Sequence, residues 1–269
     1  MSVCKAVMPK IDKALVQQSF DLASTSYHQF TGLQRLIGDR LIEQRKESVS
    51  EALTVLDVGS GTGYLTRKLS QTKGVEHLYA LDISTAMLSQ TKLNTKGLNL
   101  TARICADAEQ LPLQSASVDA VYSNLAYQWC SELQQAFDES NRVLRQQGVF
   151  AFSTFGEKTL FELKNAWRSV DQAVHVNTFI DQQTIERYVE KAGFSEIVVC
   201  SEDIVMHYQT PLQLMLELKG MGAHNINPGR NVGLTGVRGF KGMMQTYEST
   251  RTEKGIPATF QAVYGYAKK

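Results

Sequence analysis

The sequence has few cysteines, almost no net charge and no long apolar run. Its four cysteines are scattered over 269 residues without a C-x-x-C pair, so no disulfide framework is indicated and the thiols are expected to be reduced. The 28 Lys and Arg residues nearly balance the 27 Asp and Glu residues, which leaves no electrostatic case for nonspecific nucleic-acid binding. No segment approaches the roughly 18 apolar residues of a membrane span, and no apolar signal peptide opens the sequence. We therefore expect a cytoplasmic protein without nucleic-acid or membrane partners.

Histidine is also sparse, and its positions argue against a metal centre. The five histidines show no ligand spacing with one another or with cysteine, so no metal site is expected. They are His28, His77, His175, His207 and His224. The apolar share of 43% is ample for a hydrophobic core, and the length fits one domain with an appended segment.

The most informative feature present is a glycine-rich turn between an apolar strand and a helix. Residues 55–65 read VLDVGSGTGYL, with the three glycines at Gly59, Gly61 and Gly63. Glycine lets the backbone adopt positive φ and pass close to a ligand, and the helix that follows presents free N–H groups suited to a carboxylate or phosphate. Asp82 ends the next apolar strand, where a carboxylate can accept hydrogen bonds from both ribose hydroxyls. The pattern predicts a site for a nucleoside cofactor.

The glycine spacing separates two families of such cofactors. A dinucleotide site needs G-x-G-x-x-G, and Tyr64 stands where the third glycine of that motif belongs. The spacing G-x-G-x-G, preceded by Asp57, resembles motif I of class I S-adenosylmethionine-dependent methyltransferases. S-adenosyl-L-methionine is therefore the expected cofactor. The alternative is a glycine turn that serves only strand-to-helix geometry.

The resemblance to class I methyltransferases implies further cofactor contacts. In that family the acid at the end of the third strand and the next backbone N–H read the adenine edge, and Asp107 and Ala108 take those places here. Ile83 and Met87 follow Asp82 and are placed to sandwich the adenine ring, although Met87 is equally typical of a helix core. The expected cofactor residues are Asp57, Gly59, Gly61, Gly63, Asp82, Ile83, Met87, Asp107, Ala108 and Asn124.

Apolar segments alternate between strand and helix patterns along the chain. Strands are expected at 53–58, 77–82, 101–105, 118–123, 148–154, 194–202 and 258–267. Helices are expected between them at 63–72, 84–95, 132–145 and 181–192. Such alternation predicts an α/β fold with a doubly wound, mostly parallel sheet, here seven-stranded and Rossmann-like as in class I methyltransferases, with residues 1–269 as one domain.

Two additions to this sheet are expected. Residues 1–50 form an N-terminal helical cover, with amphipathic helices at 11–23 and 32–46. An insertion at 211–256, before the last strand, is interpreted as a helical lid over the cofactor cleft, because long insertions in compact folds are usually functional. It holds an apolar helix from Leu212 to Leu218 and a helix ending in Arg251 and Lys254. The alternative is that the insertion is a surface addition without a functional role.

The end of the fourth strand should face the transferable methyl group, because ligands of open α/β sheets sit outside the carboxyl ends of the strands. That segment, Ser123 to Cys130, lacks the N/D-P-P-Y/F motif of N-methyltransferases that act on DNA and protein. It also has no His or Glu placed as a general base. The absence of a base argues against an acceptor that must first lose a proton.

Three stretches closely resemble one methyltransferase family. They are Ser123 to Cys130, Leu218 to Ala223 with Gly229 and Arg230 after it, and the N-terminal helix with Tyr27. Together they resemble the BioC family, the malonyl-[acyl-carrier protein] O-methyltransferases of biotin synthesis, and the likeness spans nearly the whole chain. It weakens between Ala223 and Arg230, so no contact is carried over for 224–228.

The resemblance implies that the acceptor is the free carboxylate of a malonyl thioester on acyl carrier protein or coenzyme A. Carboxyl pKa values lie near 4, so this acceptor is already ionised at neutral pH and needs no base. Tyr27, Gln128 and Trp129 are nominated to orient it, and Lys219 or Arg230 to supply a positive charge. The competing interpretation is core packing for Trp129 and helix packing for Tyr27. For Lys219 and Arg230 it is a solvated surface position.

The implied partner is an acidic acyl carrier protein that presents malonyl-phosphopantetheine. Cations of the insertion are expected to form its docking face, namely Lys219, Arg230, Arg238, Lys241, Arg251 and Lys254. One rival function is methylation of another small molecule, such as a quinone precursor or a polycarboxylic acid. The other is a non-catalytic S-adenosylmethionine-binding scaffold, against which the intact Asp57, Asp82 and Asp107 speak.

Overall fold

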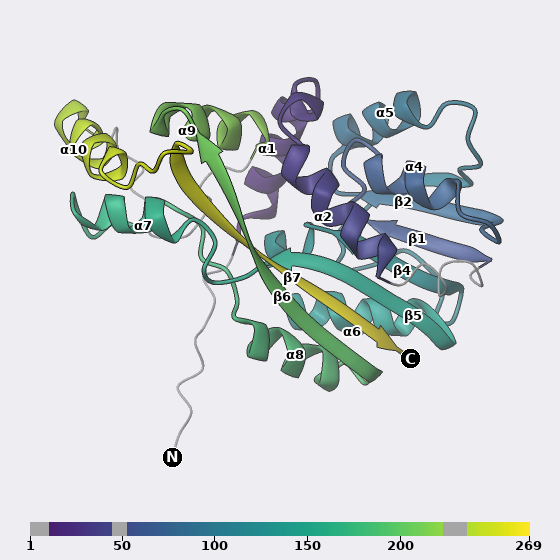
Figure 1. The fold of residues 1–269 in the computed structure, drawn as a ribbon. Helices are drawn as coiled ribbons and strands as arrows, with labels where there is room; N and C mark the ends of the chain where they lie inside the picture. Colours follow the sequence, from purple (N-terminus) through teal and green to yellow (C-terminus); the bar gives the residue numbers. More distant parts are fainter. Residues whose placement is uncertain (1–10, 45–52, 223–235) are drawn as a thin grey trace, which may run out of the picture.

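The computed structural model describes residues 11–44, 53–222 and 236–269, and a seven-stranded sheet lies at its centre (Figure 1). The strand order is β3-β2-β1-β4-β5-β7-β6. Strand β7 runs antiparallel to both of its neighbours, and the other pairs are parallel. The strands are β1 (Thr54–Val58), β2 (His77–Asp82), β3 (Ala102–Cys105), β4 (Val118–Asn124), β5 (Leu144–Phe155), β6 (Ser195–Tyr208) and β7 (Ile256–Lys268). The predicted doubly wound, mostly parallel fold is confirmed.

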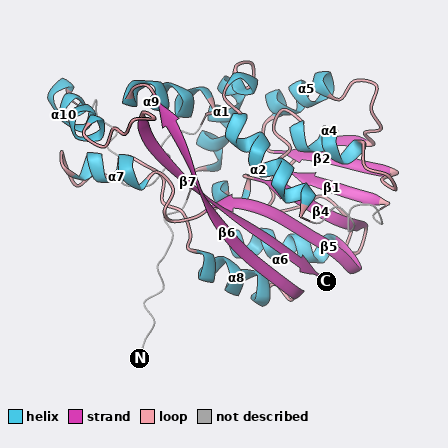
Figure 2. Cartoon of the chain, viewed as in Figure 1, coloured by secondary structure: helices cyan, strands magenta, loops and turns pink. Residues whose placement is uncertain are grey.

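Helices cover both faces of the sheet (Figure 2). On one face the side chains of α6 (Leu133–Val143) and α8 (Gln182–Lys191) pack with inward-facing residues of β1, β4 and β5. On the other face α2 (Gly32–Glu43) and α4 (Tyr64–Ser70) pack with the opposite side chains of the same strands. All five residues of β1 are buried, as expected for a parallel strand covered on both sides. From β1 the chain adds β2 and β3 on one side, and it then returns to add β4 and β5 on the other side. The direction of strand addition therefore reverses between β1 and β4, and ligand crevices lie at the carboxyl ends of the strands at such a point.

The predicted helix starts are confirmed where a side chain caps them. Ser84 accepts a hydrogen bond from the Met87 amide at 3.0 Å and opens α5 (Thr85–Asn94). Asp181 accepts one from the Thr184 amide at 2.8 Å and opens α8. Such caps satisfy amides that have no partner inside the first helical turn.

The N-terminal segment contributes α1 (Lys13–Ala23), the short helix η1 (Tyr27–Gln29) and α2. Buried Leu33, Ile37 and Leu41 hold α2 against the sheet. Helix α1 packs against α5, the helix that follows β2. It therefore lies at the edge of the sheet where β1 and β2 have their carboxyl ends.

The insertion contributes α9 (Pro211–Gly220) and α10 (Val237–Glu248). Helix α10 ends at Glu248, so the prediction that this helix reaches Arg251 and Lys254 is wrong. The chain instead forms a bridged turn from Thr252 to Gly255, where a φ of 117° at Gly255 turns the backbone into β7. Helix α7 (Phe161–Arg168) was not predicted and packs against α10 and β7. In the described ranges no helix is both long and apolar enough to cross a membrane.

Candidate active site

The glycine loop leaves β1 and is fastened to β2. The amides of Gly59 and Ser60 donate to the Leu81 carbonyl at 2.7 and 2.9 Å, and the Gly61 amide donates to Asp82 Oδ2 at 2.8 Å. The loop therefore has a fixed position relative to the acid at the end of the second strand, which is the juxtaposition that the sequence predicted.

Each glycine of the loop has a positive φ, between 54° and 87°. A Cβ on Gly59 would lie 2.1 Å from Cβ of Ala126, and one on Gly63 would lie 3.0 Å from Cγ2 of Thr91, so packing requires both glycines. A Cβ on Gly61 would meet nothing closer than the Tyr27 ring at 4.0 Å. Gly61 therefore borders open space in which a ligand can approach the backbone.

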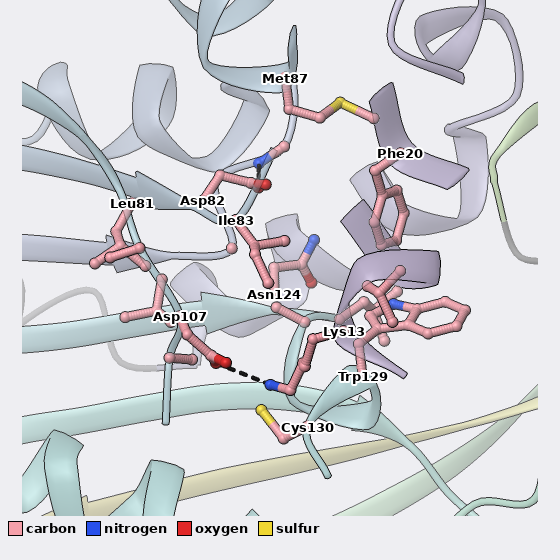
Figure 3. Close-up of a pocket in the computed structure, with 18 of the residues that line it drawn as sticks. Lys13, Phe20, Leu81, Asp82, Ile83, Met87, Asp107, Asn124, Trp129 and Cys130 are labelled. Atoms are coloured by element: carbon pink, nitrogen blue, oxygen red, sulfur yellow. Dashed lines mark hydrogen bonds and ion pairs between the residues drawn. The ribbon is translucent and has the colours of Figure 1, made fainter. Parts of the chain in front are cut away.

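That space belongs to a cavity of about 650 Å³, counting its opening to solvent (Figure 3). A concave site lined by apolar and aromatic side chains with a few polar groups is typical of small molecules and cofactors. Helix α1, the glycine loop, the ends of β2 and β3, and the segment after β4 form its walls. Among the predicted cofactor residues, those that line it are Gly59, Gly61, Asp82, Ile83, Met87, Asp107, Ala108 and Asn124. Asp57 lies behind the loop, and Gly63 lines a neighbouring surface hollow.

Asp82 borders the cavity with both of its oxygens fixed. Oδ2 accepts from the Gly61 amide, and Oδ1 accepts from the Ser84 amide at 2.8 Å. Burial raises the pKa of Asp82 to about 6, although the backbone donors oppose that shift. A carboxylate oxygen can accept more than one hydrogen bond, so the side chain retains acceptor capacity for a ligand hydroxyl.

Asp57 is 1% exposed and lies beneath the loop. Its Oδ2 accepts a hydrogen bond from the Thr66 hydroxyl, while no described residue donates to its Oδ1. Burial raises the pKa of Asp57 to about 7, and the nearby charge of Asp82 adds to the shift. A buried acceptor atom without a partner is costly unless a ligand or water satisfies it.

Asp107, at the end of β3, is joined to the first helix by a contact that sequence reasoning missed. Lys13 Nζ lies 2.8 Å from Asp107 Oδ1 and 2.7 Å from Glu109 Oε1. A lysine in the first turn of an amphipathic helix has the pattern of a solvated charge. No sequence signal relates it to an acid 94 residues away.

Of the residues that the sequence analysis nominated for the acceptor, Tyr27 and Trp129 line the cavity. Trp129 belongs to η2 (Tyr127–Trp129), and its ring meets the Phe20 ring edge-on at 5.4 Å between centroids. No described residue forms a hydrogen bond with the Tyr27 hydroxyl, whose pKa is raised by burial and by the charge of Asp82. No described residue accepts a hydrogen bond from the Trp129 indole N–H either, so each side chain brings a polar group without a described partner to a largely aromatic wall.

The other nominated acceptor residues lie elsewhere. The Gln128 amide nitrogen donates to the Leu125 carbonyl at 2.6 Å, and its oxygen accepts from the Thr154 hydroxyl at 3.2 Å. Gln128 lines a smaller neighbouring pocket of about 290 Å³. Lys219 is exposed near the end of α9 and does not line the main cavity. Arg230 lies outside the described residues.

A second residue that the sequence did not reveal is Arg35 of α2. It lines a hollow of about 420 Å³ that shares Tyr27, Gly59, Gly61 and Asn124 with the main cavity. Its guanidinium carbon lies 5.5 Å from the centroid of the Tyr64 ring. Arg35 is the cation among the described residues of this hollow, which places positive charge beside the glycine loop.

Comparison with known proteins agrees with this geometry. A family model described as "Methyltransferase domain" matches residues 56–152. Proteins named malonyl-[acyl-carrier protein] O-methyltransferase from Nitrosospira multiformis and from a Methylovorus species are 38% and 40% identical, each over 96% of this chain and 90% of the relative. The solved YcgJ protein from Bacillus subtilis shares the fold, with a TM-score of 0.61 at 16% identity over 86% of this chain and 98% of that one. The chain therefore belongs to the malonyl-[acyl-carrier protein] O-methyltransferase family.

Proposed function

We propose that this protein transfers a methyl group from S-adenosyl-L-methionine to the free carboxylate of a malonyl thioester carried by acyl carrier protein. The product is the malonyl methyl ester that starts the acyl chain of biotin synthesis. The observation that carries the proposal is the near full-length likeness to relatives with this name, in a chain whose cavity has the features of a nucleoside site. When bound, the cofactor supplies an electrophilic methyl group on a sulfonium.

The cavity fits this cofactor on two structural grounds. Gly61 leaves a space that a Cβ would enter, and Asp82, which lines the cavity, retains acceptor capacity for a ligand hydroxyl. We assign the ribose hydroxyls to Asp82 and the adenine edge to Asp107 and Ala108, with Ile83 and Met87 beside the ring. The positive charge of Arg35 next to the glycine loop suits the carboxylate of the methionine portion.

The acceptor side supports a reaction without a general base. Among the described lining residues the titratable groups besides the tyrosine and Lys13 are Asp82, Asp107 and Cys130. We assign both acids to the cofactor, and burial raises the pKa of the Cys130 thiol to about 12, so it stays protonated near neutral pH. An ionised malonyl carboxylate needs only to be held in line with the methyl group. Positioning of this kind contributes on the order of 7–11 kcal/mol.

Tyr27 and Trp129 are the described side chains that we assign to the acceptor carboxylate. Phe20 packs edge-on against both of them, with ring centroids 6.5 Å from Tyr27 and 5.4 Å from Trp129. Such an apolar wall reduces the hydration of groups bound against it, which favours a transfer in which opposite charges are annihilated. Gln128 would reach the acceptor only by giving up its contacts with Leu125 and Thr154. Lys219 or Arg230 would have to reach it from the insertion.

For the carrier protein we retain the cations of the insertion as the proposed docking face. Arg238 and Lys241 on α10 are exposed and meet no described carboxylate. Arg251 is already paired with Glu248 at 2.5 Å, so it contributes less to a new contact. Attraction between exposed charges is screened by salt, and the KM for the carrier substrate should therefore rise between low and high salt.

The test is a product assay by mass spectrometry with labelled S-adenosylmethionine. Malonyl-acyl carrier protein, malonyl-coenzyme A, a quinone precursor and a tricarboxylic acid are offered as separate acceptors. We expect base-labile methylation of the malonyl group, and about tenfold or greater loss of kcat in Tyr27→Phe if its hydroxyl orients the carboxylate. Methylation of another acceptor alone would reject the proposal, and binding of the cofactor without turnover on any acceptor would favour the scaffold.

A further inference from the structure

Helix α1 inserts a lysine into the adenine end of the cofactor cavity. Lys13 stands in the first turn of α1, its side chain is 24% exposed, and it lines the cavity. Its ammonium lies within 2.8 Å of a carboxylate oxygen of Asp107 and of Glu109. Figure 3 shows the Lys13 side chain reaching across the cavity to Asp107, below Ile83 and beside Trp129.

The bonds to Asp107 are unevenly distributed over its two oxygens. Lys13 Nζ at 2.8 Å and the Glu109 amide at 3.0 Å both donate to Oδ1. No described residue donates to Oδ2. Because Asp107 lines the cavity, two donors hold one oxygen and leave the other to accept from a ligand.

The lysine also balances charge in a partly buried cluster. Asp107 and Glu109 are two residues apart, and Lys13 contacts both carboxylates. Burial disfavours the ammonium form, yet the hydrogen bonds that Lys13 donates to Asp107 and Glu109, together with the charge of Asp107, outweigh that effect and raise the pKa of Lys13. Without the cation the two carboxylates would repel each other, and among the described donors the Glu109 amide alone would hold Asp107 Oδ1, which leaves the carboxylate more mobile.

Other contacts hold α1 in place independently of this lysine. Asp21 accepts hydrogen bonds from the Ser84 hydroxyl at 2.5 Å and the Ala86 amide at 3.4 Å. At the other end, the Ser131 hydroxyl donates to the Ile11 carbonyl at 2.7 Å. Removal of the Lys13 ammonium should therefore leave the helix docked, so its effect on Asp107 can be measured separately.

We propose that Lys13 is a positioning residue that fixes Asp107 as the acceptor for the exocyclic amine of adenine and so sets the preference for a 6-amino purine. The proposal rests on the assignment of the adenine edge to Asp107 made under the proposed function. A 6-oxo purine would turn a carbonyl oxygen towards Oδ2. The fixed carboxylate would repel it, whereas a mobile carboxylate could turn away.

The experiment compares two ligands by isothermal titration calorimetry, S-adenosylhomocysteine and its 6-oxo analogue S-inosylhomocysteine. We expect the wild type to prefer the amino compound. Lys13→Met should weaken binding of the amino compound about tenfold to hundredfold and change binding of the oxo compound far less, so that the preference shrinks. Lys13→Arg keeps a donor cation and should restore part of the preference. Lys92→Met, at an exposed site on α5, is the matched control and should change neither affinity.

Two outcomes would overturn the inference while the proposed function stands. Equal losses for both ligands in Lys13→Met would mean that the lysine only holds the cover helix, and unchanged affinities would mean that Asp107 needs no partner. Thermal unfolding of each variant without ligand checks that the fold is intact. Wild-type protein that binds neither ligand would instead reject the proposed function itself.

Discussion

The buried Asp57 carboxylate makes folding of the ligand-free protein depend on pH. Its pKa of about 7 lies above the usual value near 3.9 for an unfolded chain, mainly because of burial. The native state thus binds the proton more tightly, and its contribution to stability is complete below pH 4 and lost as the pH rises to about 7. The side chain is 1% exposed and one of its oxygens lacks a described donor.

Asp57→Asn should therefore stabilise the ligand-free protein at high pH. Its amide oxygen can accept from Thr66, and the charge that burial disfavours is gone. We expect the free energy of unfolding, relative to wild type, to rise by about 2–4 kcal/mol between pH 4 and pH 8. Urea unfolding at several pH values measures this difference, with the exposed Asp138→Asn as control. A difference that stays constant with pH would contradict the raised pKa.

The sequence predicts the position of a site residue when that position follows from the strand it belongs to and the loop after that strand. Asp82 and Asp107 end adjacent parallel strands, so their proximity to the glycine loop follows from strand order. Lys13 and Arg35 were missed because a cation on an amphipathic helix has the pattern of a solvated charge. The direction of the Gln128 side chain could not be predicted either. It depends on the short helical turn η2, which had not been predicted and which sets the neighbours of each side chain.

Between elements, the end of α9 packs against the N-terminal cover. A Cβ on Gly220 would lie 2.4 Å from Cε2 of Phe30, and one on Gly222 would lie 2.9 Å from the Ser19 carbonyl oxygen. The Gln34 amide also lies 2.6 Å from the sulfur of Met221. The insertion thus contacts the helices that wall the cavity, although its described residues do not line the cavity, and its role as a lid stays a prediction.

Gly222→Ala tests this contact. Gly222 has a φ of 71°, which costs an L-residue roughly 1–2 kcal/mol, and the added methyl would meet the backbone of α1. We expect Tm to fall by several degrees and the Kd for S-adenosylhomocysteine to rise, because α1 moves away from the cavity. Gly32→Ala, where nothing lies within 4 Å and φ is not positive, should leave both unchanged. A lower Tm with an unchanged Kd would show that the contact supports the fold only.

Elements were easiest to predict where burial makes a strong periodic signal. Strands β1, β2 and β4 carry apolar runs because helices cover both faces, and their predicted bounds agree closely with the structure. Strand β5 begins at Leu144, four residues before its predicted start and inside the helix predicted at 132–145. Strand β6 extends to Tyr208, beyond the predicted end at 202. Its end was missed because this edge strand has no continuous apolar run there: residues 203–207 alternate between exposed and half-buried. Helix α7 is short and mixes buried Glu162 with exposed Phe161, so its pattern did not stand out.

For the molecule as a whole, the cavity lies where the strand order reverses, between the sheet and a helix that closes it from the N-terminal side. Ligand that binds only the folded state stabilises it by about 2.7 kcal/mol at a concentration one hundred times Kd. For a domain of this size that corresponds to a rise in Tm of roughly 5–10 °C. S-adenosylhomocysteine should produce this rise, and adenosine, which lacks the homocysteine portion beside the glycine loop, should produce a smaller one at equal concentration.

Hydrogen exchange shows where in the molecule that stabilisation acts. Helix α1 is held over the cavity by contacts from Ile11, Lys13 and Asp21, whereas α8 packs on the far face of the sheet. If α1 closes over the ligand, amides of Lys13–Ala23 should gain more protection on binding than those of Gln182–Lys191, which serve as an internal control. Local opening of a cover helix costs less free energy than global unfolding. Amides of α1 should therefore exchange faster than those of α8 without ligand, and their exchange should slow more when the ligand binds. Equal gains in protection in both helices would mean that the ligand stabilises the whole fold, and that α1 does not close over the cavity when the ligand binds.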